Sequence, residues 1–172
     1  MKSREFGRSG LVALLLGLMI LVGAQGSMAK SQKAKKAPDI VDTLAASGSS
    51  KQLHAAIKSA GLEKTLRGKG PFTVFAPTDE AFARSKGKLA EVMKDKKKLA
   101  EVLKGHVVPG RVTSDRIKSN GALKTAHGHK VVTQVKETTI WVDGAKVIQH
   151  DVPASNGMIF FIDEVLDPDQ GN

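Results

Sequence analysis

The residues best suited to chemistry are histidines in the C-terminal half of the chain. His127 and His129 would place two imidazoles on one face of a strand, where His150 or Asp151 would be needed to complete a metal site. The spacing specifies no third ligand, and a polar strand end beside Gly128 accounts for the same residues. We therefore predict no bound metal.

Two carboxylates, Asp79 and Asp163, are the candidates for a catalytic pair, but each has a simpler role. Asp79 stands where a helix begins and Asp163 stands in a closing turn, where carboxylates accept backbone N–H bonds. The sequence contains no G-x-S-x-G, no H-E-x-x-H and no Gly-rich phosphate loop after a strand. We predict neither catalytic activity nor a cofactor, with a hydrolase of envelope polymer as an alternative.

The N-terminal sequence predicts an exported protein. The chain has 172 residues, no cysteine and a net charge of +10, so disulfides and thiol chemistry are excluded. Three basic residues precede a 13-residue apolar run at 11–23, and Ser27-Met28-Ala29 fits the small-x-small rule for signal peptidase. We predict that residues 1–29 are a signal peptide cleaved near Ala29, giving a secreted, periplasmic or cell-surface protein. An uncleaved anchor is the alternative, although a spanning helix needs about 20 residues.

A basic segment at 30–37 follows the predicted cleavage site. Its four lysines make up half of the mature charge of +8, and no side chain there is apolar enough to pack. These lysines are Lys30, Lys33, Lys35 and Lys36. We predict a flexible tail, which either holds the protein to an acidic surface polymer or anionic lipid or is a solvated spacer.

A second lysine cluster at 94–97 is interpreted as a solvated corner between two short helices. The alternative, a nucleic-acid site, lacks support because every aromatic residue of the mature chain lies in a strand-like or packing context. We therefore predict no nucleic-acid partner and at most peripheral contact with a membrane.

Residues 71–82, P-F-T-V-F-A-P-T-D-E-A-F, predict the strand-to-helix joint around which the other elements are arranged. Thr73, Val74 and Phe75 suit a buried strand that Pro77 ends, and Thr78 is a suitable N-cap for the helix that follows.

The remaining patterns predict an α+β domain. Apolar spacing and glycine stops predict helices at 38–48 and 50–61, and a near repeat at an offset of 10 residues predicts two short helices with a break near 94–97. Strands are predicted at 131–135, 139–142, 147–148 and 158–162, the last of them buried on both faces. Turns are expected at 143–144 and 156–157.

Three motifs in this order resemble the fasciclin-like domain. They are F-T-V-F-A-P-T-D-E-A-F at 72–82, H-V-V-P-G at 106–110 and N-G-M-I-F-F-I-D-E-V-L at 156–166. The resemblance covers residues 38–168, leaving 169–172 as a disordered C-terminus. It implies a wedge-shaped β-sandwich of about seven strands with several short helices packed against it. The family commonly has Tyr before the middle His and a His within the last motif, where this chain has Gly105 and Phe160.

The resemblance also implies a function. Members of this family are commonly secreted or surface proteins that mediate adhesion, so we expect a non-enzymatic module that contacts an extracellular protein, matrix or cell-envelope polymer. By analogy the partner-binding segment is His106, Val107, Val108 and Pro109, although the apolar neighbours of His106 also indicate a buried histidine bonded to backbone. The structural signature residues are Phe72, Phe75, Pro77, Thr78, Asp79, Phe82, Asn156, Gly157 and Asp163.

A carrier of a small apolar or lipid-like ligand is the alternative function. Gly105 occupies the position at which the family commonly has a bulky tyrosine, and the missing ring predicts a hollow near the middle motif unless neighbouring side chains fill it.

Overall fold

The computed structural model describes residues 37–167, apart from the side chain of Lys88. The predicted signal peptide, the lysines of the predicted tail and the C-terminal residues 168–172 lie outside this range. Within it, no helix combines the length and apolar character needed to cross a membrane.

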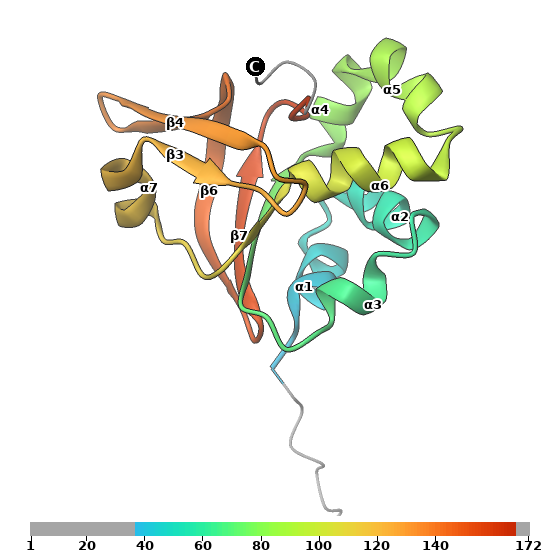
Figure 1. The fold of residues 1–172 in the computed structure, drawn as a ribbon, viewed down its shortest axis with the longest axis horizontal. Helices are drawn as coiled ribbons and strands as arrows, with labels where there is room; N and C mark the ends of the chain where they lie inside the picture. The colour runs from blue at the N-terminus through green and yellow to red at the C-terminus, as the bar shows by residue number, and fades with distance from the viewer. Residues whose placement is uncertain (1–36, 168–172) are drawn as a thin grey trace, which may run out of the picture. The chain divides into compact units, whose positions relative to one another are not determined.

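Seven helical and seven strand segments make up the described residues (Figure 1). The helices are α1 (Ile40–Ser47), α2 (Lys51–Ser59), α3 (Glu63–Leu66), α4 (Asp79–Arg84), α5 (Lys86–Val92), α6 (Lys96–Gly105) and α7 (Ser114–Asn120). The strands are β1 (Phe72–Pro77), β2 (Val107–Pro109), β3 (Ala122–Lys124), β4 (Lys130–Lys136), β5 (Thr139–Val142), β6 (Ala145–Ala154) and β7 (Gly157–Ile162).

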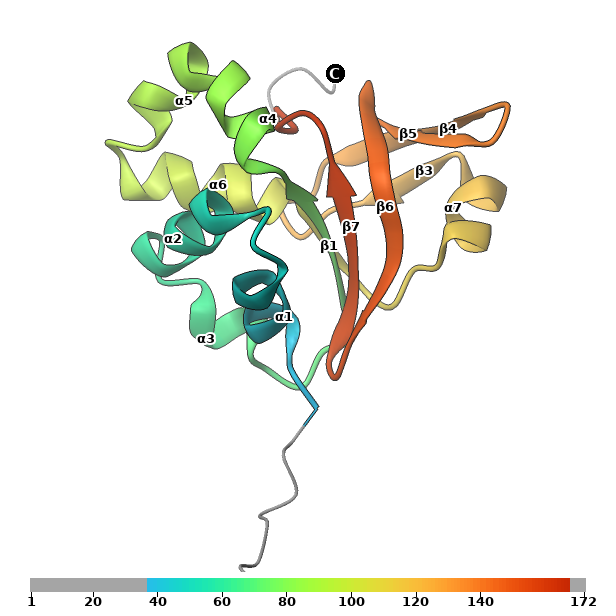
Figure 2. The ribbon, with the colours of Figure 1, turned by 180° about the vertical axis from the view of Figure 1, so that it is seen from behind.

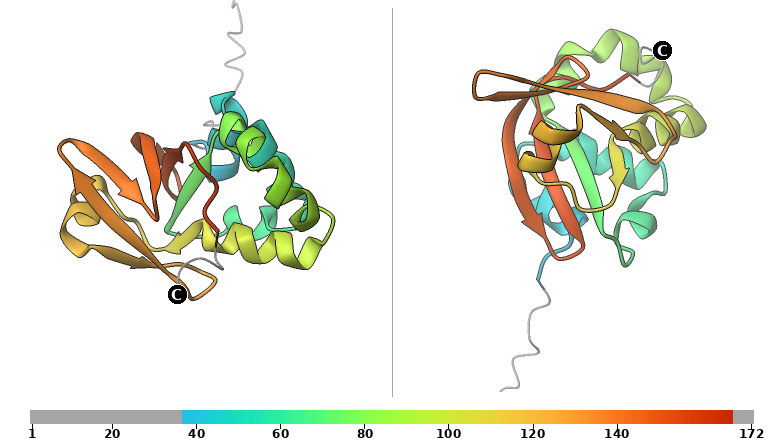
Figure 3. Two further views of the ribbon diagram at one scale, coloured as in Figure 1. Left: turned by 90° about the horizontal axis from the view of Figure 1, so that it is seen from above. Right: turned by 60° about the vertical axis from the view of Figure 1, so that its left-hand side comes forward.

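The strands form one curved sheet in the order β2-β1-β7-β6-β5-β4-β3. Among the described strands only β1 and β7 pair in parallel, and Figure 2 shows them side by side, with α1 to α6 to their left. The sheet is nearly a barrel, because the N–H of Ala126 after β3 donates to the carbonyl of Val107 in β2, 2.6 Å away. Figure 3 shows α1 to α6 gathered on one side of β1 and β7, with β3 to β6 curling away on the other.

The two faces of β1 and β7 serve two separate cores. Val74, Ile159 and Phe161 pack against the helices in one cluster, together with Leu44 of α1. Phe75 and Phe160 point the other way into the curl of the sheet, where their ring centroids are 5.6 Å apart. Since alternate residues of a strand face opposite sides, burial of both sets makes β1 and β7 the centre of the fold.

Most predicted elements are confirmed. The helices at 38–48 and 50–61 are α1 and α2, and α1 ends at Gly48 in the left-handed region with φ of 69°. The break between the two short helices falls between α5 and α6, and the strand at 158–162 is buried on both faces as β7. Asp143 and Gly144, with φ of 53° and 85°, make the predicted tight turn between β5 and β6.

Three short elements, α3, α7 and β3, were not predicted. Each gives too few buried residues for a periodic pattern: β3 buries only Leu123 and α7 buries Ser114 and Ile117. They are set by tertiary contacts, such as the bond that Thr133 Oγ1 donates to the carbonyl of Ile117, 3.2 Å away.

A Gly157→Ala substitution is expected to destabilise the fold severely. A Cβ atom at Gly157 would overlap the carbonyl oxygen of Phe72 and lie 2.7 Å from Cδ1 of Ile40, so β7 and β1 could not keep their pairing. We expect a loss of about 3 kcal/mol or more in the free energy of unfolding, measured by urea denaturation. The matched control is Gly87→Ala in α5, where a Cβ meets nothing within 4 Å and alanine should gain about 0.5–1 kcal/mol. Equal stability of the two variants would contradict this account of β7.

Candidate functional site

His106 lies at the end of α6, buried with only 2% of its surface exposed. Its Nδ1 is 2.9 Å from the carbonyl oxygen of Val102, and the N–H of Leu166 donates to its Nε2 at 2.9 Å. Because a carbonyl can only accept and an N–H can only donate, the ring is neutral with its proton on Nδ1. His106 thereby joins the C-terminal segment to α6, as expected for a buried histidine bonded to backbone.

Burial also makes the imidazolium form of His106 more acidic. Burial lowers the pKa of His106 from 6.5 to about 4, and the bond to Val102 only partly opposes this. Protonation of Nε2 would also place its N–H against the N–H of Leu166, so that two donors face each other and the hydrogen bond is lost.

The predicted partner-binding segment is largely inaccessible. Val107 and Val108 are buried along with His106, and only Pro109 is exposed. Burial therefore reduces the predicted contact surface to Pro109. Partner binding at Pro109 itself stays a prediction.

Asn156, one of the predicted signature residues, connects four parts of the chain. Its Oδ1 accepts the N–H of Ile40 at 3.0 Å, and its Nδ2 donates to the carbonyls of Leu66 and Gly68 at 2.6 and 3.0 Å. Its own carbonyl accepts the N–H of Phe72 at 3.0 Å. The side chain thus holds α1 and the end of α3 to the turn before β7, and the main-chain carbonyl adds the start of β1.

Asp79 and Asp163 are each bonded to the backbone of another element. Asp79 lies in the first turn of α4, as expected, and its Oδ1 also accepts the N–H of Gln52 at 2.8 Å, so it caps α2 as well. Asp163 Oδ1 accepts the N–H of Lys146 at 2.8 Å, which fastens the end of β7 to β6. Both carboxylates therefore have structural roles that account for their positions.

Five signature residues lie at or near the strand-to-helix joint. Thr78 is the N-cap of α4, accepting the N–H of Ala81 at 3.3 Å, and Pro77 is the last residue of β1. Phe75 and Phe82 are buried in the two cores and Phe72 is half-buried.

The three histidines and one aspartate considered for a metal site fall into two pairs. The rings of His127 and His129 stack with centroids 4.9 Å apart, while His150 Nδ1 bonds to Asp151 Oδ2 at 2.8 Å. Asp151 Oδ1 accepts the N–H of Ser114 at 2.9 Å. No group of three or more possible ligands gathers among residues 37–167.

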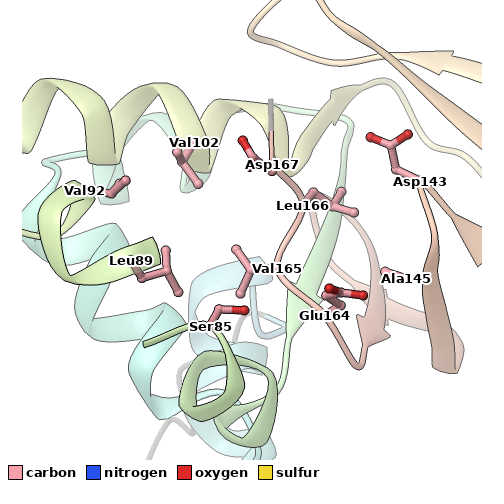
Figure 4. Close-up of a pocket in the computed structure, with 10 residues that line it drawn as sticks. All are labelled: Ser85, Leu89, Val92, Val102, Asp143, Ala145, Glu164, Val165, Leu166 and Asp167. Atoms are coloured by element: carbon pink, nitrogen blue, oxygen red, sulfur yellow. The ribbon is translucent and has the colours of Figure 1, made fainter. Parts of the chain in front are cut away.

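A cavity of about 480 Å³ with several apolar side chains in its lining lies between the helices and the C-terminal segment (Figure 4). Leu89 and Val92 of α5, Val102 of α6 and Val165 supply apolar side chains that converge on it. The carboxylates that also line it are those of Asp143, Glu164 and Asp167. This volume and lining suit a small molecule with an apolar body.

The hollow expected beside Gly105 is much smaller. The space lined by Gly105, Thr125 and Leu166 holds only about 10 Å³, room for about one water molecule. Neighbouring side chains have closed the space, so the missing tyrosine ring does not provide a ligand site.

The structure is an α+β module with one curled seven-stranded sheet, and the polar residues His106, Asn156, Asp79 and Asp163 bond to its own backbone. The profile of the fasciclin domain family matches residues 48–168, and the chain belongs to this family.

Individual relatives agree with this assignment. Protein sll1483 of a Synechocystis strain is 40% identical over 75% of this chain and 73% of its own length. Transforming growth factor-beta-induced protein ig-h3 of Sus scrofa is 37% identical, but the chain covers only 19% of that protein. The solved FAS1 domain pair of the insect cell adhesion molecule fasciclin I superposes with a TM-score of 0.57 at 24% identity, over 72% of this chain and 46% of that one. The last match shows the fold alone.

The sequence did not point to the cavity or to the bridging role of Asn156. Asn156 lies 116 residues from Ile40 and 90 from Leu66, so no local pattern marks these bonds. The residues that line the cavity come from four separate segments of the chain, so no local pattern marks the cavity either.

The burial of His106 predicts a specific pH dependence of stability. With a folded pKa of about 4 and an unfolded pKa of 6.5, the unfolded chain takes up the proton first as the pH falls. Stability is full above pH 6.5 and should fall by about 3 kcal/mol between there and pH 4.

His106→Gln supplies the matched control, because an amide can donate to Val102 and accept from Leu166 without titrating. Urea unfolding of both proteins from pH 4 to 8 should show a steeper loss in the wild type. Parallel pH profiles would contradict the role given to this histidine.

Proposed function

We propose that this protein is a non-enzymatic binding module that acts in the periplasm or outside the cell and adheres to matrix or cell-envelope polymer of acidic character. Membership of the fasciclin domain family supports a binding role. The observation that carries the choice of an acidic partner is the charge of the protein.

Positive charge predominates in both parts of the mature chain. Residues 37–167 contain 20 lysines and arginines against 15 aspartates and glutamates, a net charge of +5. Three of the acids share a single cation at the surface, since Arg67 pairs with Asp39, Asp42 and Glu63 at 2.8 to 3.1 Å. The tail adds four more lysines, so an acidic polymer meets an excess of free cationic groups.

Retention of the mature protein on immobilised acidic polysaccharide tests this proposal. We expect binding at low salt and release as salt rises, because the screening length shortens from about 30 Å at 0.01 M to about 3 Å at 1 M. Replacing Lys30, Lys33, Lys35 and Lys36 by Gln keeps the tail length and should lower the salt concentration needed for elution. Replacing four exposed lysines of α2, α3 and the following loop, Lys51, Lys58, Lys64 and Lys69, should change it less. Equal effects would refute a special role for the tail, and no retention at low salt would refute the acidic partner.

The cavity beside α5 and α6 favours a second candidate function, a carrier of a small apolar or lipid-like molecule. Its volume of about 480 Å³ and its side chains from Leu89, Val92, Val102 and Val165 support this candidate.

Native mass spectrometry of protein purified from its own source tests the carrier function. A carrier should show an added mass that is lost from a Val102→Phe variant, because the larger ring fills the cavity. Val135→Phe is the matched control, since Val135 is an exposed residue of β4 and does not line the cavity. A clean apo mass for the wild type, or equal loss in both variants, would refute a ligand in this cavity.

A further inference from the structure

The outward side of β4, β5 and β6 carries an apolar and basic surface that the binding of acidic polymer does not explain. The strand register places Gln134 and Lys146 opposite Trp141, and Lys136 opposite Thr139, so these residues share one side of the sheet. The alternate positions, among them Thr133, Ile140 and Val147, are buried toward the core. We call the outward residues the outer ribbon face: Lys130, Val132, Lys136, Trp141, Lys146 and Ile148.

Apolar side chains on this face are open to solvent. Val132 is 46% exposed and Ile148 is 57% exposed, and Trp141 between them is half-buried. Two of the four exposed large hydrophobic residues in the described part of the chain therefore lie on this face, whereas Val135 pairs with the buried Ile140 on the other side of the ribbon. Scattered apolar residues are normal on a surface, but two exposed aliphatic side chains beside the only tryptophan of the sequence indicate a contact site.

The charge of the face is uniformly positive. Its outward strand positions hold Lys130, Lys136 and Lys146 and no acid, while Glu137 and Asp143 lie in the turns at its ends. The Nζ of Lys136 is 5.6 Å from the centroid of the Trp141 ring, which holds this cation against the aromatic surface.

An open hollow of about 500 Å³ adjoins the face where β5 and β6 diverge. Arg84, Lys146, His150 and Asp163 line it together with Ile148. It offers room for a polar group beside the apolar side chains, with the Asp163 carboxylate already bonded to the backbone of Lys146.

We propose that the outer ribbon face docks on an anionic lipid bilayer. Trp141 and the aliphatic side chains of Val132 and Ile148 enter the interface between head groups and acyl chains, where tryptophan is enriched in membrane proteins. The three lysines lie against lipid phosphates, and each contributes about fivefold in affinity.

An acidic polysaccharide fits this face less well. It would satisfy the lysines but would set hydroxyl groups against the exposed side chains of Val132 and Ile148. This site is independent of the polymer binding proposed above, and its test uses a different signal.

The chain contains a single tryptophan, so its fluorescence reports on this face alone. Mature protein is mixed with vesicles of phosphatidylcholine alone, or with about one third phosphatidylglycerol. With the anionic vesicles we expect a blue shift of Trp141 emission and quenching by brominated acyl chains, and with the neutral vesicles neither.

Two variants separate the contributions. Val132→Ser with Ile148→Ser should reduce vesicle affinity at least about tenfold and abolish the quenching. Lys130, Lys136 and Lys146→Gln should reduce it about a hundredfold, at about fivefold per lysine. The control triple Lys51, Lys58 and Lys64→Gln, on the helical side of the fold, should bind as the wild type does. Since all these positions are exposed or half-exposed, urea unfolding should confirm that each variant is folded.

Three results would overturn the proposal. The first is vesicle binding without a change in Trp141 emission, which would assign the binding to the tail. The second is an equal loss of vesicle affinity in the control triple. The third is a shift of Trp141 emission with acidic polysaccharide but not with vesicles.

Discussion

The hydrogen bonds of Asn156 are the interaction on which the rest of the structure depends. Parallel strands cannot be joined by a short turn, so β1 and β7 come together from opposite ends of the domain. Asn156 fixes their relative position. Its side-chain amide accepts the N–H of Ile40 in α1 and donates to the carbonyls of Leu66 and Gly68 at and after the end of α3, and its main-chain carbonyl accepts the N–H of Phe72 in β1. Aspartate could accept but not donate, and serine is too short to bridge the three segments.

Local signals were sufficient for the elements around this junction. The unbroken apolar run of β7, the Thr78 cap and the Gly48 stop each act within a few residues, and each predicted its element correctly. β6 was predicted at only two residues and extends over ten, because two register shifts interrupt its alternation and a proline follows them. Here the partner strand determines the conformation, and a single strand's sequence carries little of that information.

The predicted site residues divide in the same way. The apolar neighbours of His106 indicated burial, which the structure shows, whereas the analogy with the family indicated a partner contact that burial confines to Pro109. Family resemblance selected Asn156 and Asp79 as signature residues, but their partners lie 27 to 116 residues away. The family motifs therefore identified which positions matter, and only the fold shows which group each of these residues is hydrogen-bonded to.

The register shifts in β6 divide this strand between two partners. Between Val147 and Val152 the partner residues in β7 go back by three, from Ile162 to Ile159, while β6 advances by five. The extra residues leave Ile148, Gln149 and His150 exposed in succession. Before the shifts β6 pairs with β5 at Ala145 and Lys146, and beyond them it pairs with β7 from Val152 to Ala154. β6 therefore joins the ribbon of β4 and β5 to the buried pair of β1 and β7, and the exposed Ile148 lies where the strand passes from one partner to the other.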